Sequence, residues 1–61
     1  METSITVTRV GNKTQNVSGI LSISDGNETC DVCYDVVRKG EYYVIIEPCG
    51  VFCTGCVDWD E

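Results

Sequence analysis

Two cysteine pairs with identical spacing dominate the C-terminal half of this chain. Cys30 and Cys33 enclose two residues, Cys53 and Cys56 enclose two more, and 19 residues separate the pairs. A C-x-x-C segment forms a tight turn that directs two sulfurs at one ion, and a return segment of about 20 residues can close the tetrahedron. The spacing therefore predicts that these four sulfurs bind one metal ion.

The length of the chain makes such a site important for folding. With 61 residues, the chain is predicted to form a single domain, residues 1–61. Domains this small bury little apolar surface and usually need a metal, disulfides or a partner. A structural Zn²⁺ supplies about 10–16 kcal/mol of apparent binding energy in small finger peptides. We therefore expect one Zn²⁺, bound by four thiolates with no open position, as is typical of structural sites.

Other uses of the same four cysteines remain open at this point. Iron occupies similar tetrahedral sulfur sites, and two disulfides or a redox-active dithiol also fit the pairs. Met1–Ser4 carries neither a basic region nor an apolar run, so no signal peptide is expected. This predicts a reducing, cytoplasmic or other intracellular compartment, where thiols are rarely paired. No segment has the roughly 20 apolar residues of a membrane span, so no membrane contact is expected.

The fifth cysteine, Cys49, has no place in a four-ligand site. It can be a small apolar residue under the second turn, a ligand that exchanges with Cys53 or Cys56, or a reactive thiol. We leave Cys49 out of the predicted site.

The N-terminal segment has the composition and alternation of a β-hairpin. Residues 3–24 are rich in Thr, Ser, Val and Ile, which favour strands. The alternating apolar residues all have odd numbers, so a loop of odd length is needed to keep them on one face. A three-residue loop at 11–13 meets this condition. We predict a hairpin within residues 1–27, whose apolar face consists of Ile5, Val7, Val17, Leu21 and Ile23.

The second half is predicted to be a metal-binding lobe, residues 28–57, followed by an acidic tail, residues 58–61. Residues 34–37 and 42–46 are expected to pair as a hairpin around a turn at 38–41. The run 42–46 is apolar throughout, which is typical of a strand covered on both faces. The expected fold is a small, zinc-stabilised all-β domain in which the N-terminal hairpin packs on this lobe.

Part of the lobe resembles a RING finger. The segment Glu-Pro-Cys-Gly-Val-Phe-Cys-Thr-Gly-Cys, residues 47–56, is similar to the RING pattern P-C-G-H-x-F-C-x-x-C, and residues 30–33 resemble its first ligand pair. In a RING, the first, second, fifth and sixth ligands share one zinc ion, which here implies Cys30, Cys33, Cys53 and Cys56. The resemblance covers residues 30–56, lacks the histidine and has no cysteine after Cys56. A second zinc ion and ubiquitin-ligase activity are therefore not expected.

The two cysteine turns with a hairpin between them also resemble a zinc ribbon, a family common in transcription and ribosomal proteins. The glycine that usually follows each ribbon pair is replaced by Tyr34 and Val57. Rubredoxins share the acidity and the paired cysteines, but their turns contain Pro and Gly and lie farther apart.

The net charge and the absence of certain residue types limit which functions are expected of this chain. The chain has ten acidic and four basic residues, a net charge of −6, and no histidine. Phosphate backbones are bound by clustered Lys and Arg, so direct nucleic-acid binding is not expected. Without a glycine-rich phosphate loop or a suitable carboxylate pair, no enzymatic activity is expected either. An acidic surface suits a protein partner with a basic surface.

These observations predict a zinc-containing protein-interaction module, a small accessory or regulatory factor such as a viral or phage protein acting on a host complex. The alternative is a zinc-ribbon-like acidic inhibitor or subunit of transcription or other nucleic-acid machinery. A RING ligase fragment and a rubredoxin-like redox protein are weaker alternatives. Trp59, between Asp58 and Asp60, is a candidate anchor for the partner, because tryptophan is frequent among interface hot spots. The other interpretation is that Trp59 and Phe52 pack on the core.

Overall fold

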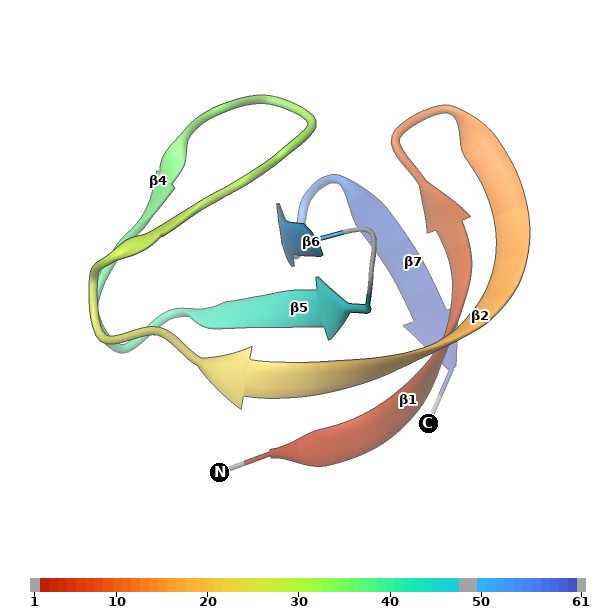
Figure 1. Cartoon of the computed structure of the whole chain (residues 1–61), viewed down its shortest axis with the longest axis horizontal. Helices are drawn as coiled ribbons and strands as arrows, with labels where there is room; N and C mark the ends of the chain where they lie inside the picture. The colour runs from red at the N-terminus through yellow and green to blue at the C-terminus, as the bar shows by residue number, and fades with distance from the viewer. Residues whose placement is uncertain (1, 48–49, 61) are drawn as a thin grey trace.

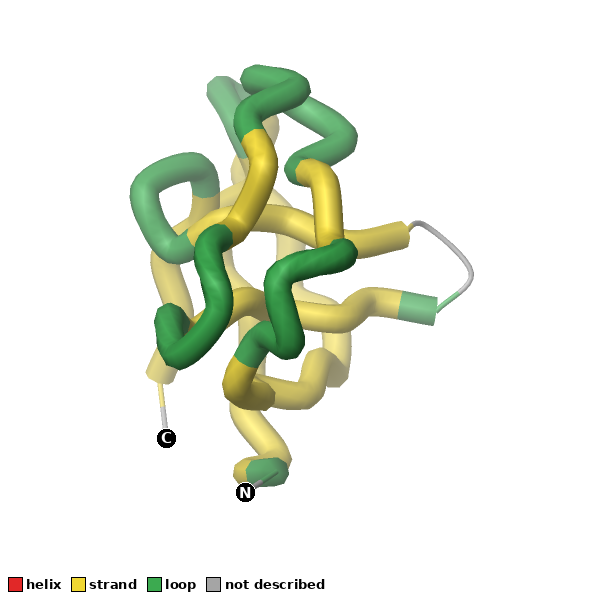
Figure 2. Tube along the Cα trace, turned by 90° about the vertical axis from the view of Figure 1, so that its left-hand side faces the viewer, coloured by secondary structure: helices red, strands yellow, loops and turns green. Residues whose placement is uncertain are grey.

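The protein is built entirely from β-strands and turns in the part of the chain that is described, residues 2–47 and 50–60 of a computed structural model. No helix occurs among these residues (Figure 2), so none can span a membrane. The predicted all-β class is confirmed. The strands are β1 (Thr3–Val10), β2 (Lys13–Ile23), β3 (Glu28–Thr29), β4 (Val36–Val37), β5 (Tyr42–Ile46), β6 (Gly50–Cys53) and β7 (Val57–Asp60).

Five of these strands form one antiparallel sheet in the order β6-β5-β2-β1-β7, and β3 and β4 form a separate pair. The long strands β1 and β2 curve around β5, β6 and β7 (Figure 1). The two edge strands, β6 and β7, are consecutive in the chain. Cys53 ends β6 and Cys56 directly precedes β7, so the second cysteine pair flanks the short turn that connects the two edge strands.

The N-terminal hairpin has the predicted alternation of side chains, but its loop and strand pairing differ from the prediction. The loop between β1 and β2 has two residues, Gly11 and Asn12, instead of three, and Val10 lies opposite Lys13. A bulge between Val7 and Arg9 then places one residue of β1 opposite two of β2, after which Val7 faces Val17. An even loop and one extra residue have the same effect as an odd loop, because each one-residue shift turns the side chains over.

The predicted apolar face of the hairpin is correct except at its end. Ile5 and Val7 are buried, and Val17 and Leu21 pack against the core. Ile23 is 41% exposed, because β2 extends past the core at this end and pairs there with Tyr42, which is exposed as well.

The region between the cysteine pairs differs from the predicted hairpin. Strand β4 pairs with β3, whereas β5 pairs with β2 and β6. Ser24 fixes this arrangement: its N–H donates to Glu41 O at 2.8 Å, and its carbonyl accepts from Gly40 N–H at 2.9 Å. The N-terminal hairpin is therefore not a separate layer packed on the lobe. It is hydrogen-bonded into the same sheet on both sides, through β2–β5 and β1–β7.

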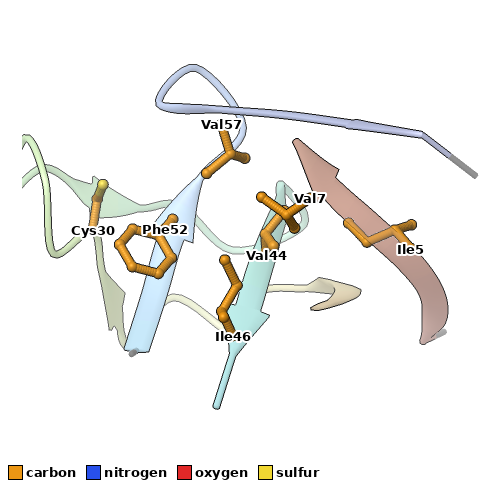
Figure 3. Close-up of a cluster of buried hydrophobic side chains, with 7 residues drawn as sticks. All are labelled: Ile5, Val7, Cys30, Val44, Ile46, Phe52 and Val57. Carbon is orange, nitrogen blue, oxygen red and sulfur yellow. The ribbon is translucent and has the colours of Figure 1, made fainter. Parts of the chain in front are cut away.

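The core is small and includes one of the cysteines. Its buried members are Ile5, Val7, Cys30, Val44, Ile46, Phe52 and Val57, shown in Figure 3. Val44 and Ile46 face this cluster from β5, while Tyr43 and Ile45 on the other face are only half-buried. The prediction that both faces of this strand are covered is therefore wrong: one face remains partly open to solvent.

Candidate metal centre

The fold brings together the four cysteines that the sequence spacing selected. All four sulfurs lie within 4.8 Å of one another. Cys53 Sγ is 3.6 Å from Cys33 Sγ and 3.4 Å from Cys56 Sγ. Four sulfurs at about 2.3 Å from one ion would be about 3.8 Å apart at the corners of a tetrahedron. The cluster has nearly these dimensions, so the four residues fit a tetrahedral metal ion.

The same distances do not correspond to disulfides. A disulfide joins two sulfurs at about 2.05 Å. Cys30, Cys33, Cys53 and Cys56 are all free thiols in the structure. Cys49, the fifth cysteine, lies outside the described residues.

Backbone hydrogen bonds shape each cysteine turn. In the first turn, Tyr34 N–H donates to Cys30 O at 3.0 Å, and Val32 N–H donates to Cys30 Sγ at 3.4 Å. In the second turn, Cys56 N–H donates to Cys53 O at 3.1 Å. Each turn thus directs two sulfurs to the same side. Amide groups that point at a sulfur also favour its thiolate form.

Asp31 attaches the first turn to the outer edge of β6. Its N–H donates to Val51 O at 2.9 Å, and its Oδ2 accepts from Val51 N–H at 3.1 Å. These two bonds satisfy backbone groups of an edge strand that would otherwise be free to pair with another chain. Because Asp31 follows Cys30 directly and Val51 is close to Cys53, this contact brings the first cysteine pair to the second.

Gly50 allows Asp31 to come this close. Its φ is +130°, a region that residues with a side chain rarely adopt. A Cβ at this position would overlap Asp31 Oδ2 and would lie 3.1 Å from Asp31 Cγ. Sequence reasoning missed the roles of Asp31 and Gly50. The glycine beside an apolar strand was the one available signal, since such a glycine often marks a close approach.

The second turn is attached to the hairpin at the opposite edge of the sheet. Gly11 N–H donates to Cys56 O at 2.6 Å, next to the pairing of Val10 with Val57. Arg9 extends this contact: its Nε donates to Asp58 Oδ2 at 2.8 Å, and its Nη1 donates to Gly11 O. Both cysteine turns are therefore fixed to the sheet, and the sheet determines the distance between them.

The first turn contains an unusual backbone conformation at Tyr34. Its φ is +63°, and among the described residues it is the one non-glycine with a positive φ. Tyr34 directly follows the first cysteine pair, and the left-handed conformation costs a residue with a Cβ roughly 1–2 kcal/mol.

The thiols of the metal-free cluster differ strongly in acidity. Burial opposes ionisation of Cys30, but amide hydrogen bonds from Cys33, Cys53 and Val32 outweigh it and lower the pKa of Cys30 to about 6. The pKa of Cys56 is raised, first by its hydrogen bond with Cys53 and then by burial. An amide hydrogen bond from Asp35 lowers the pKa of Cys33, yet hydrogen bonding to Cys30 and burial leave it raised.

Among the thiols whose pKa is shifted, Cys30 ionises most readily in the metal-free cluster, whereas the raised pKa values of Cys33 and Cys56 favour their protonated forms. A divalent metal ion would replace these protons with positive charge, so all four sulfurs could ionise together.

The cluster lies at the border between core and solvent. Cys30 is fully buried among the core side chains, and Figure 3 shows it on the Phe52 side of the cluster. Cys33 is exposed, and Cys53 and Cys56 are partly buried. A metal ion bound here would therefore connect the apolar core to both turns.

The candidate partner residues have different environments. Trp59 lies in β7 opposite Val7 and packs against the core while remaining half-buried. Asp58 accepts the hydrogen bond from Arg9, which lowers its pKa. Asp60 is exposed. Phe52 is 5% exposed and belongs to the core, as one of the two interpretations predicted. Glu61, at the end of the predicted acidic tail, lies outside the described residues.

No protein-family model, curated protein or solved structure matches the chain. The resemblance to RING fingers and zinc ribbons therefore depends on the cysteine spacing and the motif residues alone.

Proposed function

We propose that this chain is a protein-interaction module whose fold is held by one structural Zn²⁺ bound to Cys30, Cys33, Cys53 and Cys56. The sulfur cluster is the observation that carries the proposal: four thiols from two distant turns meet at distances close to those of a tetrahedral site. When bound, the ion supplies positive charge that holds four thiolates in one place.

Zinc is preferred because the site has the features of a structural centre. Four protein sulfurs complete a tetrahedron, which leaves no position for water or substrate. The folding energy that zinc contributes is also what such a small core of buried side chains requires. Iron fits the same sulfur geometry, and a rubredoxin-like protein would be red.

Protein binding is supported by the surface of the domain. The net charge is −6, and a zinc ion would leave two of the four thiolate charges uncompensated. Large apolar side chains are exposed at Tyr34, Val36 and Tyr42. Exposed apolar side chains within an acidic surface suit a partner with a basic surface, bound by an accessory or regulatory factor such as a small viral or phage protein. No enzymatic activity and no direct nucleic-acid binding form part of this proposal.

The alternative is an acidic inhibitor or subunit of a nucleic-acid enzyme, which occupies a basic cleft in place of nucleic acid. The net charge supports this alternative as well. The steepness of the salt dependence separates the two functions: charge mimicry over a whole cleft predicts affinity that falls steeply with ionic strength, whereas apolar docking assisted by a few charge pairs predicts a shallower fall.

Native mass spectrometry of protein purified without added metal tests the metal centre. We expect one zinc ion per chain, and unfolding when a chelator removes it. Cys30→Ser/Cys33→Ser should abolish both zinc binding and the fold, while Thr54→Ser, a conservative change within the second turn, should preserve them. Protein that folds with neither zinc nor iron would refute the proposal.

A further inference from the structure

The strained residue of the first cysteine turn contributes almost nothing to the core. Tyr34 is 76% exposed although its backbone adopts the left-handed conformation that favours glycine. Glycine would satisfy the turn without strain. Strain of this kind is concentrated at functional sites, where another requirement maintains it. The exposed phenol ring is what the tyrosine adds to this position, and the ring is available for a contact outside the domain.

A groove begins directly after Tyr34. It has a volume of about 590 Å³ and runs between β4, the end of β2 and the second cysteine turn. Leu21 and Trp59, which pack on the core, contribute to its apolar lining. Val36 and Tyr42 line it as well and are 61% and 51% exposed.

The charged side chains that line the groove are acidic. Asp35 and Glu41 both line it, and Lys and Arg do not. Cys53 of the metal centre lines it too, next to Thr54. A second hollow of about 490 Å³ shares Thr54 and Trp59 with the groove and is lined by Asp58 and Asp60. Trp59 thus lies between two acidic hollows, and Asp58 is the one of these four carboxylates that is paired with a basic side chain.

We infer that this groove binds an extended segment of the partner in which an apolar side chain is flanked by Lys or Arg. The apolar side chain would pack on Leu21 and Trp59, between Val36 and Tyr42, while the basic side chains meet Asp35 and Glu41. Charge complementarity specifies the flanking residues, and the apolar lining specifies the central one. Tyr34 directly precedes the groove residue Asp35 in the chain, and we assign its exposed ring to the same surface. The inference rests on the proposed function and assigns its binding site.

The position of Trp59 in the groove gives this residue a different role from the one that the sequence suggested. The sequence suggested that Trp59 inserts into the partner as an anchor. Its packing against the core instead makes it part of the receiving surface. A rigid aromatic wall of this kind accepts a partner side chain with little loss of conformational freedom.

The test is a titration of isotope-labelled, zinc-loaded protein with a synthetic peptide that carries lysines and arginines around one central leucine, followed by NMR. We expect saturable shifts concentrated at Val36, Tyr42, Leu21 and Trp59. Two matched peptides define the chemistry, one with serine in place of leucine and one with glutamates in place of the basic residues. Each should bind at least about tenfold more weakly.

Variants test the surface without disturbing the core. Val36→Ser and Tyr34→Gly should each weaken binding several-fold, with an unchanged or higher midpoint of thermal unfolding. Ile20→Ser is the matched control, because Ile20 is 38% exposed and lines a different hollow, on the outer face of the sheet. It should not change the affinity.

The inference would be overturned by no binding of the leucine peptide, by shifts that map away from the groove, or by equal binding of the serine or the glutamate peptide. Unaltered affinity in both Val36→Ser and Tyr34→Gly would do the same. Zinc content and thermal unfolding are measured on the same samples. If the protein is zinc-loaded and folded but does not bind the peptide, only the inference about the groove is refuted. If the protein folds without metal, the proposed function is refuted.

Discussion

Replacing Gly50 with alanine tests whether Asp31 sets the distance between the two cysteine turns. The added Cβ would overlap Asp31 Oδ2, and the φ of +130° would become unfavourable. The backbone strain is about 1–3 kcal/mol. Displacing the carboxylate from Val51 N–H costs about 1.5–3 kcal/mol more, since hydrogen bonds to charged groups are among the stronger ones. Alanine also reduces the conformational entropy of the unfolded chain, and this offsets about 0.4–1 kcal/mol of the loss in stability.

The resulting loss is about 3 kcal/mol. It should lower the midpoint of thermal unfolding by about 12–24 °C in a domain of this size. If zinc binding and folding are one equilibrium, the same loss should weaken zinc affinity about 100-fold. Competition with a zinc-chelating dye measures the affinity, and circular dichroism of the zinc-loaded protein measures the midpoint.

Gly55→Ala is the matched control for this variant. Gly55 lies in the second cysteine turn, no heavy atom lies within 4 Å of its added Cβ, and its φ is not positive. This variant should bind zinc like the parent protein. A double-mutant cycle identifies the cause: Asp31→Ala should cost much less when Gly50→Ala is already present, because the carboxylate has been displaced. Equal zinc affinities of Gly50→Ala and Gly55→Ala would refute the reasoning.

Three further predictions concern the strained turn, the core and pH. Tyr34→Gly should leave stability unchanged or raise it by up to about 1 kcal/mol in urea unfolding, because relief of strain exceeds the entropy cost of glycine; a loss above about 1 kcal/mol would contradict this. Val44→Ala should cost about 2–3 kcal/mol because Val44 is fully buried, whereas Val36→Ala at the surface should cost less than about 0.5 kcal/mol, and equal effects would contradict the assigned core. The lowered pKa of Cys30 stabilises the metal-free fold; this contribution is complete above its ordinary value of 9.0 and is lost as pH falls to about 6. Zinc affinity should rise with pH, because the raised pKa values of Cys33 and Cys56 keep protons on sulfurs that zinc must displace. Zinc competition at several pH values measures this dependence, and an affinity independent of pH would contradict it.

The choice of the four cysteines could be read from the sequence because it depends on local geometry. A C-x-x-C segment closes its own turn, and the length of the segment between two such turns limits where the second can lie. The strand Tyr42–Ile46 and the apolar face around Ile5 and Val7 were also predictable, because periodicity and composition are local properties. The strand Val57–Asp60 could have been predicted as well, since Val57 and Trp59 alternate with aspartates.

The pairing of the strands was decided only by the tertiary structure. Sequence proximity favoured a hairpin between residues 34–37 and 42–46, but β5 pairs with β2 and β4 pairs with β3. The register of β1 and β2 depends on a bulge. Together with the two-residue loop, the bulge keeps the same side chains on the apolar face as the predicted three-residue loop.

The sequence by itself determined which four sulfurs meet, and the tertiary structure determined what holds them together. The contact of Asp31 with Val51 joins residues 20 positions apart, and Gly50 permits it by lacking a side chain. The groove beside Tyr34 likewise combines residues from β2, β4, β5 and β7. Cysteine spacing indicates which sulfurs can share an ion, whereas contacts such as these depend on how the strands pair in the folded sheet.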